Sequence, residues 1–157
     1  MNIVSEHGMM QLCNAVIIQA AKDYRKHMRY LIKHPRTPEL ELQVKEARAE
    51  RKKMIDDYVE REKNFIADRE YRKWMAIHEE GDVFDREAFK KTVVVTVPKK
   101  RFPLTKEERI LEQIIKHEIM VDEIERFFLS KWYMVLTDVD GTSLLKKLKE
   151  EFACESD

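Results

Sequence analysis

The chain is poor in the residues that make turns. Its 157 residues include only three glycines and four prolines. Because hairpins and tight loops draw on these two residue types, their scarcity argues against a β-rich architecture and predicts a mainly α fold. The two cysteines, Cys13 and Cys154, lack the spacing of metal ligands, and we expect free thiols in a reducing compartment.

Long apolar runs and an excess of one charge are also missing. We find no run that could span a bilayer and no signal peptide, so we expect a cytoplasmic protein with no membrane partner. The 30 Lys/Arg balance the 30 Asp/Glu, and this neutrality does not demand a nucleic-acid partner. The charge is nevertheless uneven, at +4 over residues 1–37 and −5 over residues 102–157. We interpret the asymmetry as attraction between the two ends of the chain, the alternative being the steering of a partner.

What the chain has in abundance is helix-forming sequence, and charged residues make up 38% of it. The longest apolar helix is expected over residues 105–136, where Thr105 and Glu108 form a capping box. Phe128 and Trp132 are expected among its most buried residues, in contact with the first helix. Large side chains recur at helical spacing along it: Ile110, Ile114, Val121, Ile124, Phe128, Trp132 and Val135.

Two further helices complete the predicted small helical core. The first begins at a Ser5 cap and runs to about His34, where Pro35 stops it. The last helix begins after residues 136–142 (LTDVDGT) and presents Leu144, Leu145, Leu148 and Phe152. The predicted inner face of the first helix consists of Met10, Cys13, Ile17, Ala20, Tyr24, Met28 and Leu31.

The middle of the chain predicts a long charged helical arm over residues 39–80, followed by at most one short β-hairpin or strand. The arm has a thin apolar seam that can hold one neighbouring helix, which favours a homodimer. Residues 92–97 (TVVVTV) are the predicted strand, paired with residues 102–104 or with another chain. The expected oligomer interface consists of Val44, Ala47, Met54, Tyr58, Phe65, Val93 and Val95.

Two basic groups are candidates for binding a partner. In the first helix, spacings of four, three and four residues place four cations on one face, flanked by Arg25 and Arg36. The face consists of Lys22, Lys26, Arg29 and Lys33. The second group is a tip formed by Lys99, Lys100 and Arg101. Such groups are either solvated surface or contacts for phosphates or an acidic protein.

Motifs that suggest chemistry lack the context that the chemistry needs. LTDVDGT resembles the nucleophile motif of haloacid-dehalogenase phosphatases, but a helix precedes it and only fifteen residues follow. We interpret it as a turn favoured by Asp138, Asp140 and Gly141, with Thr142 or Ser143 as the cap of the last helix. A calcium loop would have Leu136 as its first ligand, and the zinc motif begun by His117 has Val121 in place of the second histidine. The five histidines do not cluster in the sequence, so we expect no enzyme, no cofactor and no metal.

Two separated segments carry a resemblance to a known family. Residues 15–35 (AVIIQAAKDYRKHMRYLIKHP) and 124–148 (IERFFLSKWYMVLTDVDGTSLLKKL) resemble the opening and the close of small helical proteins encoded in phages and integrative elements of Gram-positive bacteria. The resemblance implies a phage or mobile-element origin and brings no assigned catalytic residues. It also implies that the middle is inserted, and we expect a helical core of residues 1–37 and 102–157 with an arm of residues 38–101.

These observations lead to two hypotheses for function. The first is a non-catalytic protein that binds a host macromolecule in the bacterial cytoplasm and modulates or inhibits it, for example a defence system, as anti-CRISPR proteins do. Its partner would be a host or phage protein or a protein–nucleic acid complex. The alternative is an accessory or regulatory protein that binds nucleic acid through the basic helix face.

Overall fold

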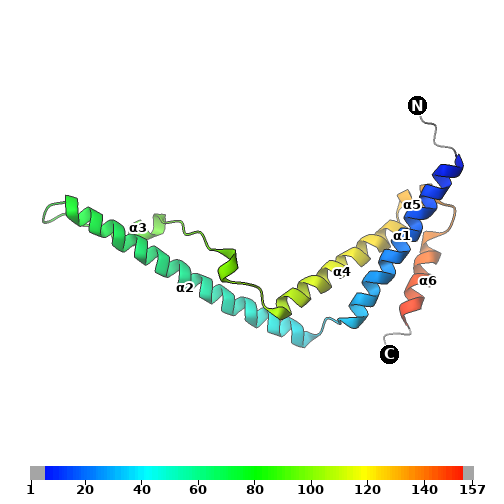
Figure 1. Cartoon of the computed structure of the whole chain (residues 1–157), viewed down its shortest axis with the longest axis horizontal. Helices are drawn as coiled ribbons and strands as arrows, with labels where there is room; N and C mark the ends of the chain where they lie inside the picture. The colour runs from blue at the N-terminus through cyan, green and yellow to red at the C-terminus, as the bar shows by residue number, and fades with distance from the viewer. Residues whose placement is uncertain (1–5, 154–157) are drawn as a thin grey trace. The chain divides into compact units, whose positions relative to one another are not determined.

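The computed structural model describes residues 6–153 and confirms the mainly α fold (Figure 1). Within these residues the structure contains no strand. Ser5 and Cys154, for which a cap and a free thiol were predicted, lie outside the described residues. The elements are α1 (Glu6–Lys33), α2 (Pro38–Ile77), α3 (Arg86–Thr92), the 3-10 helix η1 (Lys99–Arg101), α4 (Lys106–Phe128), α5 (Lys131–Leu136) and α6 (Gly141–Ala153).

The chain divides into two compact units. Unit 1 comprises Met1–Glu41 and Arg109–Asp157, and unit 2 comprises Leu42–Glu108. These divisions lie a few residues beyond the boundaries expected from the sequence, after residues 37 and 101. The two ends of the chain thus belong to one unit, and the charged middle forms the other.

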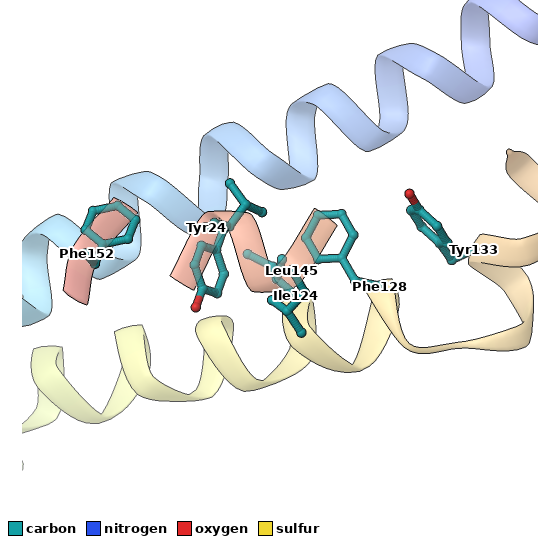
Figure 2. Packing of buried hydrophobic residues seen from close by; sticks show 7 residues of the cluster. Tyr24, Ile124, Phe128, Tyr133, Leu145 and Phe152 are labelled. Atoms are coloured by element: carbon teal, nitrogen blue, oxygen red, sulfur yellow. The ribbon is translucent and has the colours of Figure 1, made fainter. Parts of the chain in front are cut away.

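The core of unit 1 is built by α1, α4, α5 and α6 (Figure 2). Phe128 is only 2% exposed, as predicted, and it packs with Tyr133 at 5.7 Å between ring centroids. Tyr24 of α1 is buried beside Phe152 of α6, and its hydroxyl donates to Glu125 Oε1 of α4 at 3.1 Å. Elements more than a hundred residues apart in the sequence are thereby joined around one aromatic cluster.

The prediction of one continuous helix over residues 105–136 is wrong. The helix α4 ends at Phe128, and Ser130 caps α5 by accepting a hydrogen bond from the Tyr133 backbone N–H at 3.2 Å. A serine hydroxyl competes with the helical backbone for such bonds, so it ends one helix and begins another. The break turns Tyr133 inward and leaves Trp132, predicted to be buried, 63% exposed.

Close packing of α6 against the break explains why it occurs there. Gly141 begins α6 against the end of α4, and a Cβ added to it would lie 1.9 Å from the Phe128 carbonyl oxygen. Only a residue without a side chain fits at this distance. A helix that continued straight past Phe128 would lose the contact between Gly141 and the Phe128 carbonyl, and Tyr133 would no longer point inward.

The helix α2, which belongs to unit 2 from Leu42 onward, is uninterrupted over 40 residues and spans about 60 Å at ~1.5 Å per residue. The short helix α3 is tied to it by two ion pairs. Arg86 lies 2.9 Å from Asp68, and Lys90 lies 2.5 Å from Glu60. The Lys90 ammonium lowers the pKa of the Glu60 carboxyl through a hydrogen bond and its charge.

The predicted strand at residues 92–97 is also wrong. Thr92 ends α3, and the residues that follow are extended without strand pairing. Val93, Val95 and Val97 are half-buried while Val94 is 90% exposed, so successive side chains point to opposite sides as in an extended chain. Because residues 99–101 turn into η1, residues 102–104 do not return as a second strand, and the valines pack in unit 2 without a sheet.

The predicted capping box at the start of α4 is confirmed. Glu108 Oε2 accepts from the Thr105 backbone N–H at 2.8 Å, and Thr105 Oγ1 accepts from the Glu108 N–H at 3.3 Å. Glu108 is only 1% exposed and forms an ion pair with Arg51 of α2. Arg51 therefore interrupts the apolar seam of α2 because it neutralises a buried carboxylate.

Candidate functional site

The clearest candidate for a binding surface is the basic face of α1, which we define as Lys22, Lys26, Arg29 and Lys33. All four side chains are exposed. At about 100° per residue they lie within one narrow sector of the helix, opposite the buried Tyr24. The apolar side of α1 therefore anchors in the core and directs this face away from it, as the sequence predicted. Its role in binding stays a prediction.

The flanking arginines are already occupied within unit 1. Arg25 makes two hydrogen bonds to Glu151 of α6, at 2.8 and 2.9 Å. Its guanidinium lowers the pKa of the Glu151 carboxyl. Arg36 lies 2.5 Å from Glu41 and 3.0 Å from Glu118. Arg25 thus joins α1 to α6, and Arg36, in the loop after α1, is held by residues of α2 and α4, so both are poorly placed to contact a partner.

The four cations of the basic face differ from these arginines. Among residues 6–153, none of the four has an ion-pair partner within 4.0 Å. Along the helix they extend over about 16 Å at ~1.5 Å per residue. The face therefore presents concentrated positive charge on a rigid element, at a spacing that suits phosphates or a row of carboxylates.

The basic tip of the sequence analysis belongs to unit 2. Lys99, Lys100 and Arg101 form η1, and all three are exposed. The Arg101 guanidinium lies over the Tyr58 ring, 4.7 Å from its centroid. Tyr58 also packs edge-on against Phe102 at 5.7 Å. The tip is thus held on α2 by aromatic contacts, and its role in binding a partner also stays a prediction.

The predicted oligomer interface falls into two sets. Val44 is buried, and Ala47, Tyr58, Val93 and Val95 are half-buried by the chain itself. The second set, Met54 and Phe65, is exposed. The covered face of α2 drifts from the predicted seam because helical contacts repeat every 3.6 residues, and Ile55 and Ile66 lie on it instead.

Sequence analysis missed a histidine cluster on the other side of α1. His27 and His117 approach through their Nδ1 atoms at 2.7 Å. The Tyr30 ring stacks on His117 at 3.8 Å and on His34 at 4.3 Å between centroids. The spacing of residues 27, 30 and 34 was a signal for a shared helix face. That His117 of α4 meets this face was not visible in the sequence.

Neither these imidazoles nor the acidic residues form a recognisable metal site. Among residues 6–153 no group of three or more His, Cys, Asp or Glu side chains is arranged to hold a metal ion. In LTDVDGT, Asp140 accepts hydrogen bonds from the backbone N–H groups of Thr142 and Ser143, both at 3.3 Å, at the start of α6. The motif therefore forms a turn with a cap at the start of α6, as predicted, but the capping residue is Asp140 and not Thr142 or Ser143.

Comparison with known proteins adds no relative: no protein-family model, no curated protein and no solved structure matches this chain. No helix within residues 6–153 is both long and apolar enough to cross a membrane. Any functional assignment must therefore rest on the surfaces described above.

Proposed function

We propose that this chain is a non-catalytic binding protein that docks the basic face of α1 onto an acidic surface of a host macromolecule. The observation that carries the proposal is the set of four exposed cations on one rigid helix face of the described chain, none with an ion-pair partner within 4.0 Å. Charge of this kind accelerates association and orients a partner before contact.

The cellular setting of the proposal follows from the family resemblance. In this proposal the chain acts in the bacterial cytoplasm, where it modulates or inhibits a host component such as a defence system. The partner that the basic face of α1 would bind is an acidic protein surface, alone or within a protein–nucleic acid complex. The neutral net charge of the chain favours such a local contact over general binding to nucleic acid.

Packing beneath the basic face supports its use as a docking element. Tyr24 fixes the opposite side of α1 in the aromatic core, and Arg25 joins α1 to α6 through Glu151. Side chains on a rigid helix lose less conformational freedom on binding than those on a loop. The predicted homodimer would present two such faces, and linked contacts strengthen binding without new chemistry.

The proposal can be tested with polyanions of known chemistry. We expect the protein to bind poly-glutamate at 50 mM salt and to lose affinity steeply by 200 mM. The variant with Lys22→Glu, Lys26→Glu, Arg29→Glu and Lys33→Glu should lose this binding. A matched variant with Lys45→Glu, Lys52→Glu, Lys53→Glu and Arg69→Glu changes the net charge equally, through exposed residues of α2, and should retain most of it.

Short duplex and single-stranded DNA serve as the second probe under the same conditions. Binding to DNA that exceeds binding to poly-glutamate, and that the α1 variant alone abolishes, would establish the nucleic-acid alternative instead. Equal losses in the α1 and α2 variants would mean that only net charge matters, and the basic face would be rejected as a site.

A further inference from the structure

The N-terminal half of α1 has a composition unlike the rest of the chain. Residues 8–21 (GMMQLCNAVIIQAA) contain no charged side chain, although 38% of all residues are charged. They form four continuous turns of α1. A helix with apolar residues on several sides is normally covered on more than one of them.

One side of this segment continues a helix face that is covered further along. His27 and Tyr30 contact His117 of α4, so this face of α1 is the one that α4 packs against. Helical spacing extends this face from His27 toward the N-terminus. The residues on it there are Val16, Leu12 and Met9. The N-terminal turns of α1 continue past the end of α4 at Phe128 (Figure 1). For Met9, Leu12 and Val16 the covering helix has ended.

The short helix α5 adds to the same uncovered end of unit 1. Met10 of α1 lines a hollow together with Val135 and Val139. Trp132 precedes Val135 by one helical turn. We define the apolar end surface as Met9, Met10, Leu12, Val16, Trp132 and Val135, whose exposed fractions lie between 41% and 76%.

We infer that a second copy of this chain covers the apolar end surface and forms a two-fold dimer. The six side chains expose together about 400 Å² of apolar area, taking ~60–120 Å² for an aliphatic side chain and ~200 Å² for tryptophan. A standard dimer buries about 800 Å² per partner, of which about 65% is apolar. These six residues alone thus supply most of the apolar area that a stable dimer needs.

The low charge of this surface favours a second copy as the occupant. Its six side chains are uncharged and Asp138 lies only at the hollow, so the best match in a partner is another surface dominated by apolar side chains. In a two-fold contact each copy presents the same patch, so Leu12 and Val16 of one copy can cover the equivalent residues of the other. This surface is separate from the basic face, which starts at Lys22, and it therefore leaves that face free.

Light scattering coupled to size exclusion, over a dilution series, tests the inference. We expect twice the chain mass of 18.9 kDa at high concentration and a shift toward 18.9 kDa on dilution. Leu12→Glu with Val16→Glu should give the monomer mass throughout, with unchanged helicity by circular dichroism, because both residues are exposed in the single chain. If this variant loses helicity, Val135→Lys provides the same test from α5.

The matched control variant places the same two charges on the seam predicted from the sequence. Met54→Glu with Phe65→Glu alters two exposed residues of α2 and should leave the dimer intact. Dissociation by this variant alone would make α2 the interface and overturn the inference. A constant mass of 18.9 kDa for the unmodified chain at every concentration would overturn it as well. A monomer would lose only the affinity added by two linked faces and would keep the salt-dependent binding of one basic face, so the two proposals fail independently.

Discussion

The imidazole rings of His27 and His117 meet through their Nδ1 atoms at 2.7 Å, although ninety residues separate them in the sequence. At this distance one neutral ring donates its N–H and the other accepts it. Burial lowers the pKa of both rings, and neighbouring positive charge, including Lys26, lowers it further. The nearby Asp23 opposes the effect at His27. This contact joins α1 to α4 only while at least one ring is uncharged.

The first prediction is a loss of stability in mild acid. Because the folded-state pKa values lie below the ordinary value near 6.5, the unfolded chain takes up protons first as the pH falls. The contribution of the His27–His117 pair to the free energy of unfolding is therefore present above about pH 6.5 and is lost as the pH falls below it. The urea midpoint of the unmodified chain should be lower at pH 5.5 than at pH 7.5. This decrease should be smaller in the double variant His27→Gln/His117→Gln. His7→Gln, in an exposed residue of α1, should change nothing in this difference.

The second prediction contrasts two aromatic residues that sequence periodicity treats alike. Phe128→Ala should cost about 3–5 kcal/mol of unfolding free energy, because it empties a buried site in the aromatic core. Trp132→Ala should cost less than about 0.5 kcal/mol, since its side chain is exposed. Urea melts at a dilution where the chain is monomeric measure both values. Equal costs would mean that the break at Ser130 does not exist in solution.

A third prediction concerns the buried ion pair of Glu108 and Arg51. Arg51→Met should cost about 3–5 kcal/mol, because it removes the closer counter-charge of the buried Glu108 carboxylate. Arg48 also pairs with Glu108, but it is exposed and lies 4.0 Å from Oε1, an atom with no hydrogen-bond partner in the described structure. Adding Glu108→Gln to Arg51→Met should restore part of the loss, since glutamine retains the capping box. No recovery in the double variant would show that the charge is not the cause.

The fourth prediction separates the two aspartates of LTDVDGT. Asp140→Ala should lower the urea midpoint, because Asp140 caps α6 through the N–H groups of Thr142 and Ser143. The Ser143 hydroxyl also donates to it at 2.7 Å, and these bonds lower the pKa of its carboxyl. Asp138→Ala changes an exposed residue and should leave the midpoint in place. Phosphatase turnover that Asp138→Asn abolishes would contradict the structural assignment of the motif.

Much of the local structure was predictable because short-range interactions decide it. The C-terminal end of α1 and the start of α4 follow from Pro35 and the Thr105–Glu108 capping box. Asp140 and Gly141 also predicted a turn before α6, although the cap was expected at Thr142 or Ser143 and is Asp140. The four cations of the basic face were also predictable, since helical spacing alone places Lys22, Lys26, Arg29 and Lys33 together. In each case the interacting groups lie within a few turns of one another.

The remaining features depended on contacts between distant residues. Whether Trp132 or Tyr133 turns inward was decided by Ser130 and by Gly141 packing against Phe128, because α6 occupies the place of a straight helix. The valines after Thr92 have strand propensity but no neighbouring strand to satisfy their backbone, so they remain extended without a sheet.

What the sequence alone determined is therefore the set of helices, their caps and the residues that share a helix face. Only the tertiary structure decided which faces are covered: it placed His117 beside His27 and left Leu12 and Val16 beyond the end of α4. The physical reason is that hydrophobic burial has no direction. It favours covering every apolar face, and the lengths and breaks of the neighbouring helices determine which faces remain uncovered.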